Sequence, residues 1–393
     1  MSQIPANLIR SRMPELDTLR GIAISGVLLL HGFYWRYSDL QFTGLTGLLF
    51  RATAWGWVGV NLFFVLSGFL ITGILLDARN DDQYYRRFYV RRALRILPAY
   101  YGLLAVLAVL RQASLPYVGI SLVYLANLTT LFGISNDYGP LWSLAVEEHY
   151  YLFWPMVVRR LNAVSVGALA VFICATVPFL RMAAFRLGTV EGLSTYTWLV
   201  GDGLATGSVV ACLLRIHSTR RGAIRLCAVI VAAAAFGLTL GVPWGITTRT
   251  RPLGAMFQFT VVNLFCAGLL LLFLLLGTSR WRGYVNFRAV RFLGYISYGL
   301  YLIHLLVFRL YDQLCGSLFP NLQPDGTRFR LMVLRFLIAA TAATSLAYLS
   351  RRHFEERFLR LKDRFTPAFS RSVSSEPVGV VIPMASAARS NSE

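Results

Sequence analysis

Long apolar runs alternate with short polar segments along most of this 393-residue chain. A helix needs about 20 predominantly apolar residues to cross the hydrocarbon core of a bilayer. Runs near that length, some of them shorter, occur at residues 21–36, 54–76, 96–110, 115–133, 140–158, 163–180, 195–214, 226–242, 253–277, 290–308 and 331–350. The pattern predicts an all-α polytopic membrane protein.

The distribution of arginine and lysine predicts which runs cross the membrane, because cytoplasmic loops are enriched in both residues. If run 115–133 does not cross and the amino terminus is cytoplasmic, 27 of the 38 basic residues lie in the cytoplasm and 11 lie elsewhere. If that run crosses, the split becomes 17 against 21. We therefore expect about ten transmembrane helices, both termini in the cytoplasm, and a re-entrant or interfacial segment at 115–133.

Composition agrees with a membrane location. Hydrophobic residues make up 56% of the chain and charged residues 14%, and the mean hydropathy is +0.58, outside the range of ordinary soluble domains. The net charge of +20 raises the possibility of nucleic-acid binding. However, the arginines lie in short clusters between apolar runs, as in topogenic loops, so membrane lipids are the expected partners. The five cysteines show no disulfide or metal spacing, and no metal is expected.

Two regions are expected along the chain. Residues 1–365 contain all the apolar runs and form a membrane-embedded domain. Residues 366–393 are rich in Ser, Pro and Ala and have no periodic pattern. This composition predicts a disordered cytoplasmic tail.

The first apolar run carries a charged residue and an imidazole. Arg20 and His31 are eleven residues apart, which places them on one face of an ideal α-helix, about 16 Å apart along its axis. Arg20 can then lie at one membrane surface while His31 lies near mid-depth. Because an ionisable side chain at that depth is costly, His31 is a candidate functional residue.

A second candidate is the pair Arg92 and Arg95, which share one side of a helix. Two guanidinium forks at this spacing suit a phosphate or pyrophosphate group. The alternative is that they are topogenic residues contacting lipid headgroups. That alternative explains the neighbouring Arg86 and Arg87 well, whereas the spacing of Arg92 and Arg95 favours an anion site.

Carboxylates in run 140–158 form a third candidate. Glu147 and Glu148 cannot both face lipid, and Glu147 shares a helix face with Tyr151. Glu148 points about 100° away and is free to pair with an arginine. A structural carboxylate–arginine pair is the alternative to a catalytic role for either glutamate.

Two further polar residues have structural interpretations. Ser67 lies beside Gly68, a combination typical of close helix packing in membranes, and it lacks the Gly-x-Ser-x-Gly surroundings of a nucleophile. His304 has no same-face charged partner in the sequence. A structural, hydrogen-bonded histidine is therefore favoured there over a catalytic one.

Together these segments resemble acyltransferase family 3, the integral-membrane O-acyltransferases of bacterial envelope glycans and some metabolites. The resemblance covers about residues 13–362 and rests on five blocks: Leu16–Gly21 with the following His31, Gly59–Leu70, Arg92–Pro98, Trp142–Pro155 and Ile296–His304. Two positions depart from the family pattern. Thr18 stands where Gly is more common, and His149 stands where Gln is usual.

The resemblance implies transfer of an acyl group, most simply acetyl, from acyl-CoA to a hydroxyl of a glycan or glycosylated small molecule. It places the protein in the bacterial cytoplasmic membrane, with CoA at the arginine-rich cytoplasmic face. His31 is then the expected general base, because an imidazole suits that task near neutral pH. The other candidate residues are Glu147, Arg20 and Tyr151 in the catalytic centre and Arg92 and Arg95 in the CoA site. A covalent acyl relay through His31 or a hydroxyl is the second possible mechanism.

Two other classes of protein share part of this pattern. A transporter or flippase of a glycan or lipid-linked substrate also carries polar residues at mid-membrane, but no inverted repeat is visible in the sequence. A membrane sensor with a basic surface for anionic lipids would explain the charge, but it gives no reason for His31 and Glu147.

Overall fold

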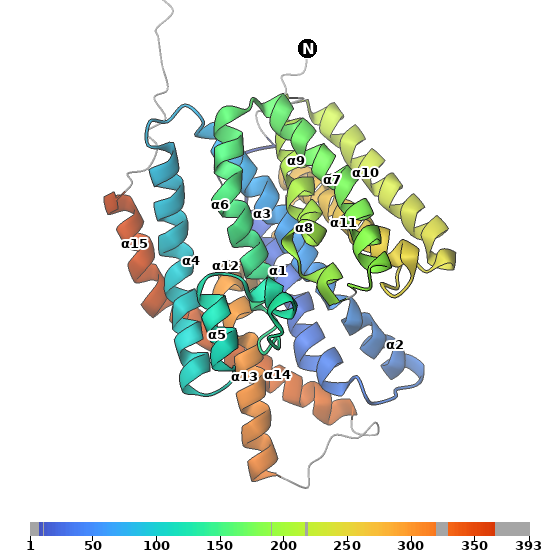
Figure 1. Cartoon of the computed structure of the whole chain (residues 1–393), viewed down its shortest axis with the longest axis vertical. Helices are drawn as coiled ribbons and strands as arrows, with labels where there is room; N and C mark the ends of the chain where they lie inside the picture. Colours follow the sequence, from blue (N-terminus) through green and yellow to red (C-terminus); the bar gives the residue numbers. More distant parts are fainter. Residues whose placement is uncertain (1–7, 11, 190, 217–218, 320–328, 366–393) are drawn as a thin grey trace, which may run out of the picture.

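The computed structural model describes residues 8–10, 12–189, 191–216, 219–319 and 329–365, and all regular structure within these ranges is helical (Figure 1). The α-helices are α1 (Pro14–Leu29), α2 (Gly44–Thr53), α3 (Val58–Asp77), α4 (Tyr84–Val109), α5 (Leu115–Leu122), α6 (Leu141–Arg160), α7 (Ala163–Arg186), α8 (Thr197–Val200), α9 (Asp202–Ile216), α10 (Arg220–Gly241), α11 (Pro252–Gly277), α12 (Arg288–Tyr295), α13 (Ser297–Leu318), α14 (Phe329–Ser350) and α15 (Glu356–Phe365). Five-residue π-helical turns follow α1 at Leu30–Tyr34 and α14 at Arg351–Glu355.

Seven helical segments of the described chain are long and apolar enough to cross a membrane. They are Pro14–Tyr37, Gly44–Asp77, Tyr84–Val109, Ala163–Arg186, Arg220–Trp244, Pro252–Gly277 and Phe329–Leu361. Helices α12 and α13 form an eighth candidate if they are taken as one span bent by 79°. The all-helical membrane architecture expected from the sequence is therefore present.

The remaining apolar runs also form helices, of less typical character. Run 140–158 becomes α6, which has 20 residues but carries two glutamates and two arginines. Run 195–214 becomes the short α8 followed by the 15-residue α9. Run 115–133 becomes the eight-residue α5 and a 3-10 helix at Ala126–Phe132. Since eight residues of helix span only about 12 Å, α5 is too short to cross a bilayer.

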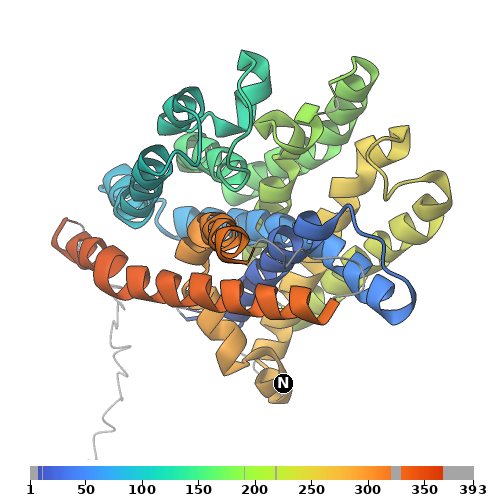
Figure 2. The ribbon, with the colours of Figure 1, turned by 90° about the horizontal axis from the view of Figure 1, so that it is seen from below.

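Helix α3 lies at the centre of the bundle, where it packs against α1, α6, α9 and α11. Its contact with α9 is close because a glycine stands at the crossing on each side. A Cβ atom on Gly68 would lie 1.9 Å from the Leu204 carbonyl oxygen, and one on Gly207 would lie 2.0 Å from that of Val65. Close approach through small residues is a common way for membrane helices to associate. Viewed from below, α14 and α15 continue one another along one side of the bundle (Figure 2).

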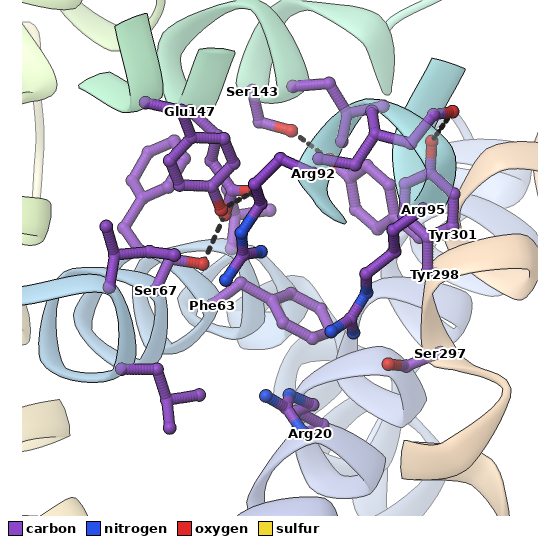
Figure 3. A pocket seen from close by; sticks show the side chains of 17 residues that line it. Arg20, Phe63, Ser67, Arg92, Arg95, Ser143, Glu147, Ser297, Tyr298 and Tyr301 are labelled. Atoms are coloured by element: carbon purple, nitrogen blue, oxygen red, sulfur yellow. Dashed lines mark hydrogen bonds between the residues drawn. The ribbon is translucent and has the colours of Figure 1, made fainter. Parts of the chain in front are cut away.

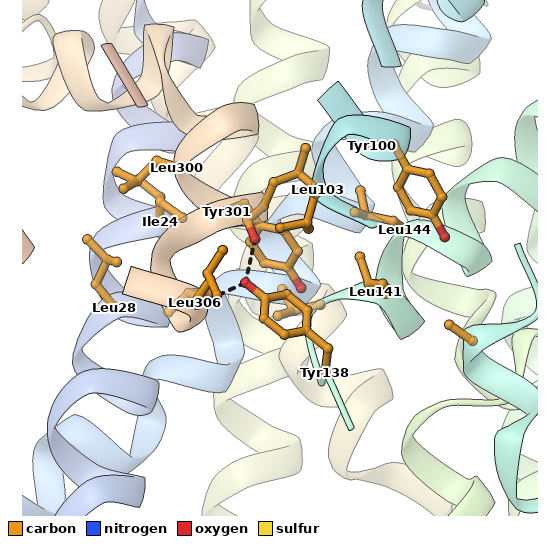
Figure 4. Close-up of a cluster of buried hydrophobic side chains, with 14 of the residues drawn as sticks. Ile24, Leu28, Tyr100, Leu103, Tyr138, Leu141, Leu144, Leu300, Tyr301 and Leu306 are labelled. Carbon is orange, nitrogen blue, oxygen red and sulfur yellow. Dashed lines mark hydrogen bonds between the residues drawn. The ribbon is translucent and has the colours of Figure 1, made fainter. Parts of the chain in front are cut away.

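A buried apolar cluster joins α1, α4, α6 and α13 (Figure 4). Tyr138, just before α6, enters this cluster, and its hydroxyl contacts the backbone of α13. The hydroxyl donates to the Leu302 carbonyl oxygen at 2.7 Å and accepts from the Leu306 amide at 3.1 Å. An α-helix ordinarily joins these two groups to each other. The Tyr138 hydroxyl thus contacts both ends of the helical turn that contains His304.

Candidate active site

Two adjoining cavities lie along α1, α3 and α4. The inner cavity is closed by α6 and α13, and the outer cavity is closed by α12, the π-helical turn after α14 and α15. The inner cavity has a volume of about 100 Å³, and the outer cavity has about 570 Å³. Arg20, Arg92 and Arg95 line both cavities, and their guanidinium groups converge on the same space (Figure 3). The three arginines singled out in the sequence therefore form a common boundary between the two cavities.

The outer cavity carries an excess of positive charge. Its lining includes six arginines but only two carboxylates: Arg20, Arg87, Arg91, Arg92, Arg95 and Arg351 against Asp17 and Asp81. Asp17 accepts from Arg20 at 2.8 Å, and Asp81 accepts from Arg87 at 2.7 Å. A hollow lined largely by one sign of charge concentrates ligands of the opposite sign. The geometry thus favours a polyanionic ligand.

Helix α4 carries four of these six arginines, and it is fixed against α6. The Tyr84 hydroxyl donates to the Pro155 carbonyl oxygen at 2.9 Å, and the Tyr89 hydroxyl donates to that of Leu152 at 2.8 Å. One turn further along α4, the Arg92 guanidinium lies over the Tyr151 ring of α6, 5.0 Å from its centroid. This cation–π contact orients Arg92 toward the cavities without using its hydrogen-bond donors.

Glu147 and Ser67 meet in the inner cavity. Glu147 accepts hydrogen bonds from Ser67 Oγ at 2.9 Å and from the Tyr151 hydroxyl at 3.0 Å, and both lining residues are visible in Figure 3. The hydrogen-bond partners of Glu147 thus come from α3 and its own helix, and His31 is not among them. Ser67, which the sequence suggested as a packing residue, belongs to the cavity wall.

His31 lies in the π-helical turn after α1 and pairs with His304 of α13. Nδ1 of His31 is 2.9 Å from Nε2 of His304, and the Trp35 ring packs edge-on at 4.5 Å between centroids. The interpretation of His304 as a hydrogen-bonded residue agrees with this contact, but its partner was not foreseen. Because the two histidines are 273 positions apart, no local spacing in the sequence could have indicated the pair.

Tyr301 connects the histidine pair, His31 with His304, to the inner cavity. Its side chain lines that cavity, its hydroxyl is 2.6 Å from Ser143 Oγ, and its ring centroid is 5.8 Å from that of His304. The candidate residues therefore form two neighbouring groups. Arg20, Arg92, Arg95, Glu147 and Tyr151 line the inner cavity, whereas the histidine pair lies behind Tyr301 and outside that lining.

Two other polar residues of α6 take no part in these cavities. His149 Nδ1 is 2.7 Å from the Thr197 hydroxyl of α8, so this departure from the family pattern joins two helices. Glu148 makes no ion pair with an arginine among the residues that the structure describes. The predicted pairing of Glu148 is therefore not seen in this part of the chain.

Comparison with known proteins gives this geometry a context. A peptidoglycan O-acetyltransferase of Listeria monocytogenes, OatA, is 32% identical over 165 residues, which are 37% of this chain and 24% of that protein. A putative peptidoglycan O-acetyltransferase of Bacillus subtilis, YrhL, is 36% identical over 163 residues, 37% of this chain and 23% of its own. A putative O-acetyltransferase of Staphylococcus aureus is 32% identical over 170 residues, 38% of this chain and 25% of its own.

These matches span about a quarter of the relatives' length, and no solved structure matches significantly. The family-level match is much more extensive. The model of an acyltransferase domain, that of acyltransferase family 3, matches residues 13–352. The match includes α1, both cavities except for Leu359, and the histidine pair. Since it spans most of the chain, the protein belongs to acyltransferase family 3.

Proposed function

We propose that the protein is a membrane O-acyltransferase that moves an acyl group, most simply acetyl, from acyl-CoA to a hydroxyl of an envelope glycan or glycosylated small molecule. The observation that carries this proposal is the pair of adjoining cavities whose shared boundary consists of three arginines. The positively charged outer cavity and the smaller inner cavity match a donor that has phosphate groups at one end and a slender chain at the other. The names of the relatives favour acyl transfer over transport without chemistry.

The outer cavity is the proposed site for the phosphates of CoA. Guanidinium groups bind phosphates bidentately and stay charged at any working pH. Arg92 and Arg95 would contact these phosphates, and Arg20 would contact them from α1. In the proposed topology the chain crosses the bacterial cytoplasmic membrane ten times and both termini lie in the cytoplasm. The outer cavity then opens on the cytoplasmic side, where acyl-CoA is made.

The inner cavity is the proposed path of the pantetheine arm. It leads from the three arginines to Tyr301, which contacts His304. The thioester would thus come to rest beside the histidine pair. Glu147 accepts hydrogen bonds from Ser67 and Tyr151. Its carboxylate has further lone pairs, which would hold the acceptor hydroxyl directly or through a water molecule.

In the proposed chemistry His31 acts as general base. It removes the proton of the acceptor hydroxyl while the oxygen attacks the thioester carbonyl carbon. The carbon–sulfur bond then breaks, and the departing thiolate of CoA takes the proton from the His31 imidazolium. The products are the ester and free CoA, and the imidazole is restored.

The proposal is tested with membranes that contain the protein and are supplied with radiolabelled acetyl-CoA. Label should pass to envelope glycans with the wild type, and His31→Ala should abolish this transfer while expression and membrane insertion stay normal. His353→Ala is the matched control, because His353 is exposed and lies outside both cavities. Near-full transfer by His31→Ala would remove His31 from the mechanism. Label that stays in CoA with the wild type would favour the transporter.

A further inference from the structure

His304 uses both of its ring nitrogens, and their partners differ in kind. Nδ1 lies 2.8 Å from the Tyr301 carbonyl oxygen and 3.2 Å from that of Leu300. Nε2 lies 2.9 Å from Nδ1 of His31. Carbonyl oxygens only accept hydrogen bonds, so the proton of His304 must be on Nδ1.

The surroundings of His304 favour a neutral ring. The side chain is fully buried, and its neighbours include the rings of His31, Tyr301 and Phe308. No carboxylate is among its hydrogen-bond partners in the described chain. An imidazolium at this depth would lack a counter-charge and cost much free energy. A neutral imidazole with its proton on Nδ1 has a lone pair on Nε2, which therefore accepts.

The donor in the bond between the two histidines is consequently Nδ1–H of His31. The other nitrogen of His31, Nε2, then carries the free lone pair. His31 is only partly buried, whereas His304 lies behind it with no exposed surface. The accessible histidine of the pair is thus the one with a nitrogen left to accept a proton.

We infer that His304 is a positioning residue that holds His31 in the Nδ1–H tautomer and so makes Nε2 of His31 the proton-accepting atom. This inference rests on the proposed function, in which His31 is the base. In serine proteases a carboxylate fixes the tautomer of the catalytic histidine. Here a second imidazole does so, beside a hydrogen bond from His31 to the Val27 backbone, and two backbone carbonyls of α13 fix the tautomer of that second imidazole in turn.

The arrangement also defines what happens when His31 is protonated. The new proton enters at Nε2, and Nδ1–H continues to donate to His304. His304 neither gains nor loses a proton during turnover. Its contribution is therefore to orientation and to stabilisation of the imidazolium, which acts on the chemical step and leaves the donor site unchanged.

The first test needs no acceptor substrate and uses one variant, only to assign signals. The chain contains five histidines, so ¹⁵N-histidine labelling of the full-length protein in nanodiscs gives a simple spectrum, in which the His31 signals are identified by their loss in His31→Gln. We expect a protonated Nδ1 and an unprotonated Nε2 for His31. A protonated Nε2 in the neutral wild-type ring would overturn the inference.

The second test uses variants of His304 with acetyl-CoA as the donor. His304→Phe keeps a ring and removes both nitrogens, and it should lower kcat by about 10²–10⁴-fold with KM for acetyl-CoA changed less than about twofold. His304→Gln restores an acceptor near Nε2 and should recover part of kcat. His353→Phe, at an exposed position, is the control and should behave as the wild type.

The two proposals fail in different ways. Activity in His31→Ala would contradict the general-base function itself. An inactive His31→Ala together with a fully active His304→Phe would leave that function standing and refute the positioning role of His304. If His304→Phe does not fold, the tautomer observed in the wild type still tests the inference about His304, and His31→Ala still tests the general-base function.

Discussion

Arg20, Arg92 and Arg95 were singled out from the sequence among many basic residues. All three also contribute to the count of cytoplasmic charges, and each lines both cavities. Arg86 is exposed on the same helix as Arg92 and lines neither cavity. Arg87, grouped with Arg86 from the sequence, instead lines the outer cavity and pairs with Asp81. Burial beside a cavity therefore separates these arginines better than their spacing does.

Replacement of Arg92 and Arg95 by Gln should weaken acyl-CoA binding by roughly tenfold or more per arginine. Each charge-assisted hydrogen bond to a phosphate contributes about 1.5–3 kcal/mol, and a tenfold change in Kd corresponds to about 1.4 kcal/mol. Isothermal titration of the purified variants with acetyl-CoA measures the effect. Arg86→Gln is the matched control on α4, and equal losses in the control and the two cavity variants would show that the arginines act only through overall charge.

At the scale of helices, the apolar pattern carried most of the prediction. It located the seven candidate spans, and the count of basic residues separated out the run at 115–133, which forms no helix long enough to cross. The pattern could not show the π-helical turn at Leu30–Tyr34, because a wider turn has no distinct apolar period. Of Arg20 and His31, which the ideal-helix argument predicts on one face, Arg20 lines the cavities and His31 does not. The partner of His31 is His304, in a helix far away in the sequence, so no pattern within one helix indicates the contact.

The segment over 115–133 should begin and end on the same side of the membrane, since α5 is too short to cross. In a variant without the five native cysteines, single cysteines at Ser114 and Asn136, both exposed, should each react with a membrane-impermeant maleimide added outside intact cells. A cysteine at Asp82, exposed before α4, should react only after the cells are permeabilised. Labelling of Ser114 and Asn136 from opposite sides would mean that the segment crosses and that the ten-span topology is wrong.

At the scale of the whole molecule, the outer cavity joins elements from both ends of the chain. Its lining runs from Asp17 in α1, through α3 and α4, to Arg351 and Leu359 beyond α14. Arg351 lies over the Tyr295 ring at 4.9 Å and donates to Glu355 at 3.2 Å, which holds it beside the cavity. The sequence offered only the count of basic residues after position 350, and no local motif distinguishes Arg351 from Arg352.

Arg351→Gln should weaken acetyl-CoA binding by about tenfold, because it removes one guanidinium from the proposed phosphate site. Arg352→Gln should leave binding unchanged, since Arg352 is exposed in the same π-helical turn and lines neither cavity. The same titration with acetyl-CoA compares the two. An unchanged Kd in Arg351→Gln would exclude the carboxyl-terminal elements from the donor site.

The Tyr138 hydroxyl connects α13 to the segment before α6. The carbonyl of Leu302 and the amide of Leu306 both contact this hydroxyl, so the turn of α13 that contains His304 is held from another segment. The Tyr117 hydroxyl donates to the Tyr138 carbonyl oxygen at 2.6 Å. Helix α5, which is too short to span a bilayer, is thereby connected through two tyrosine hydroxyls to the turn that positions His304.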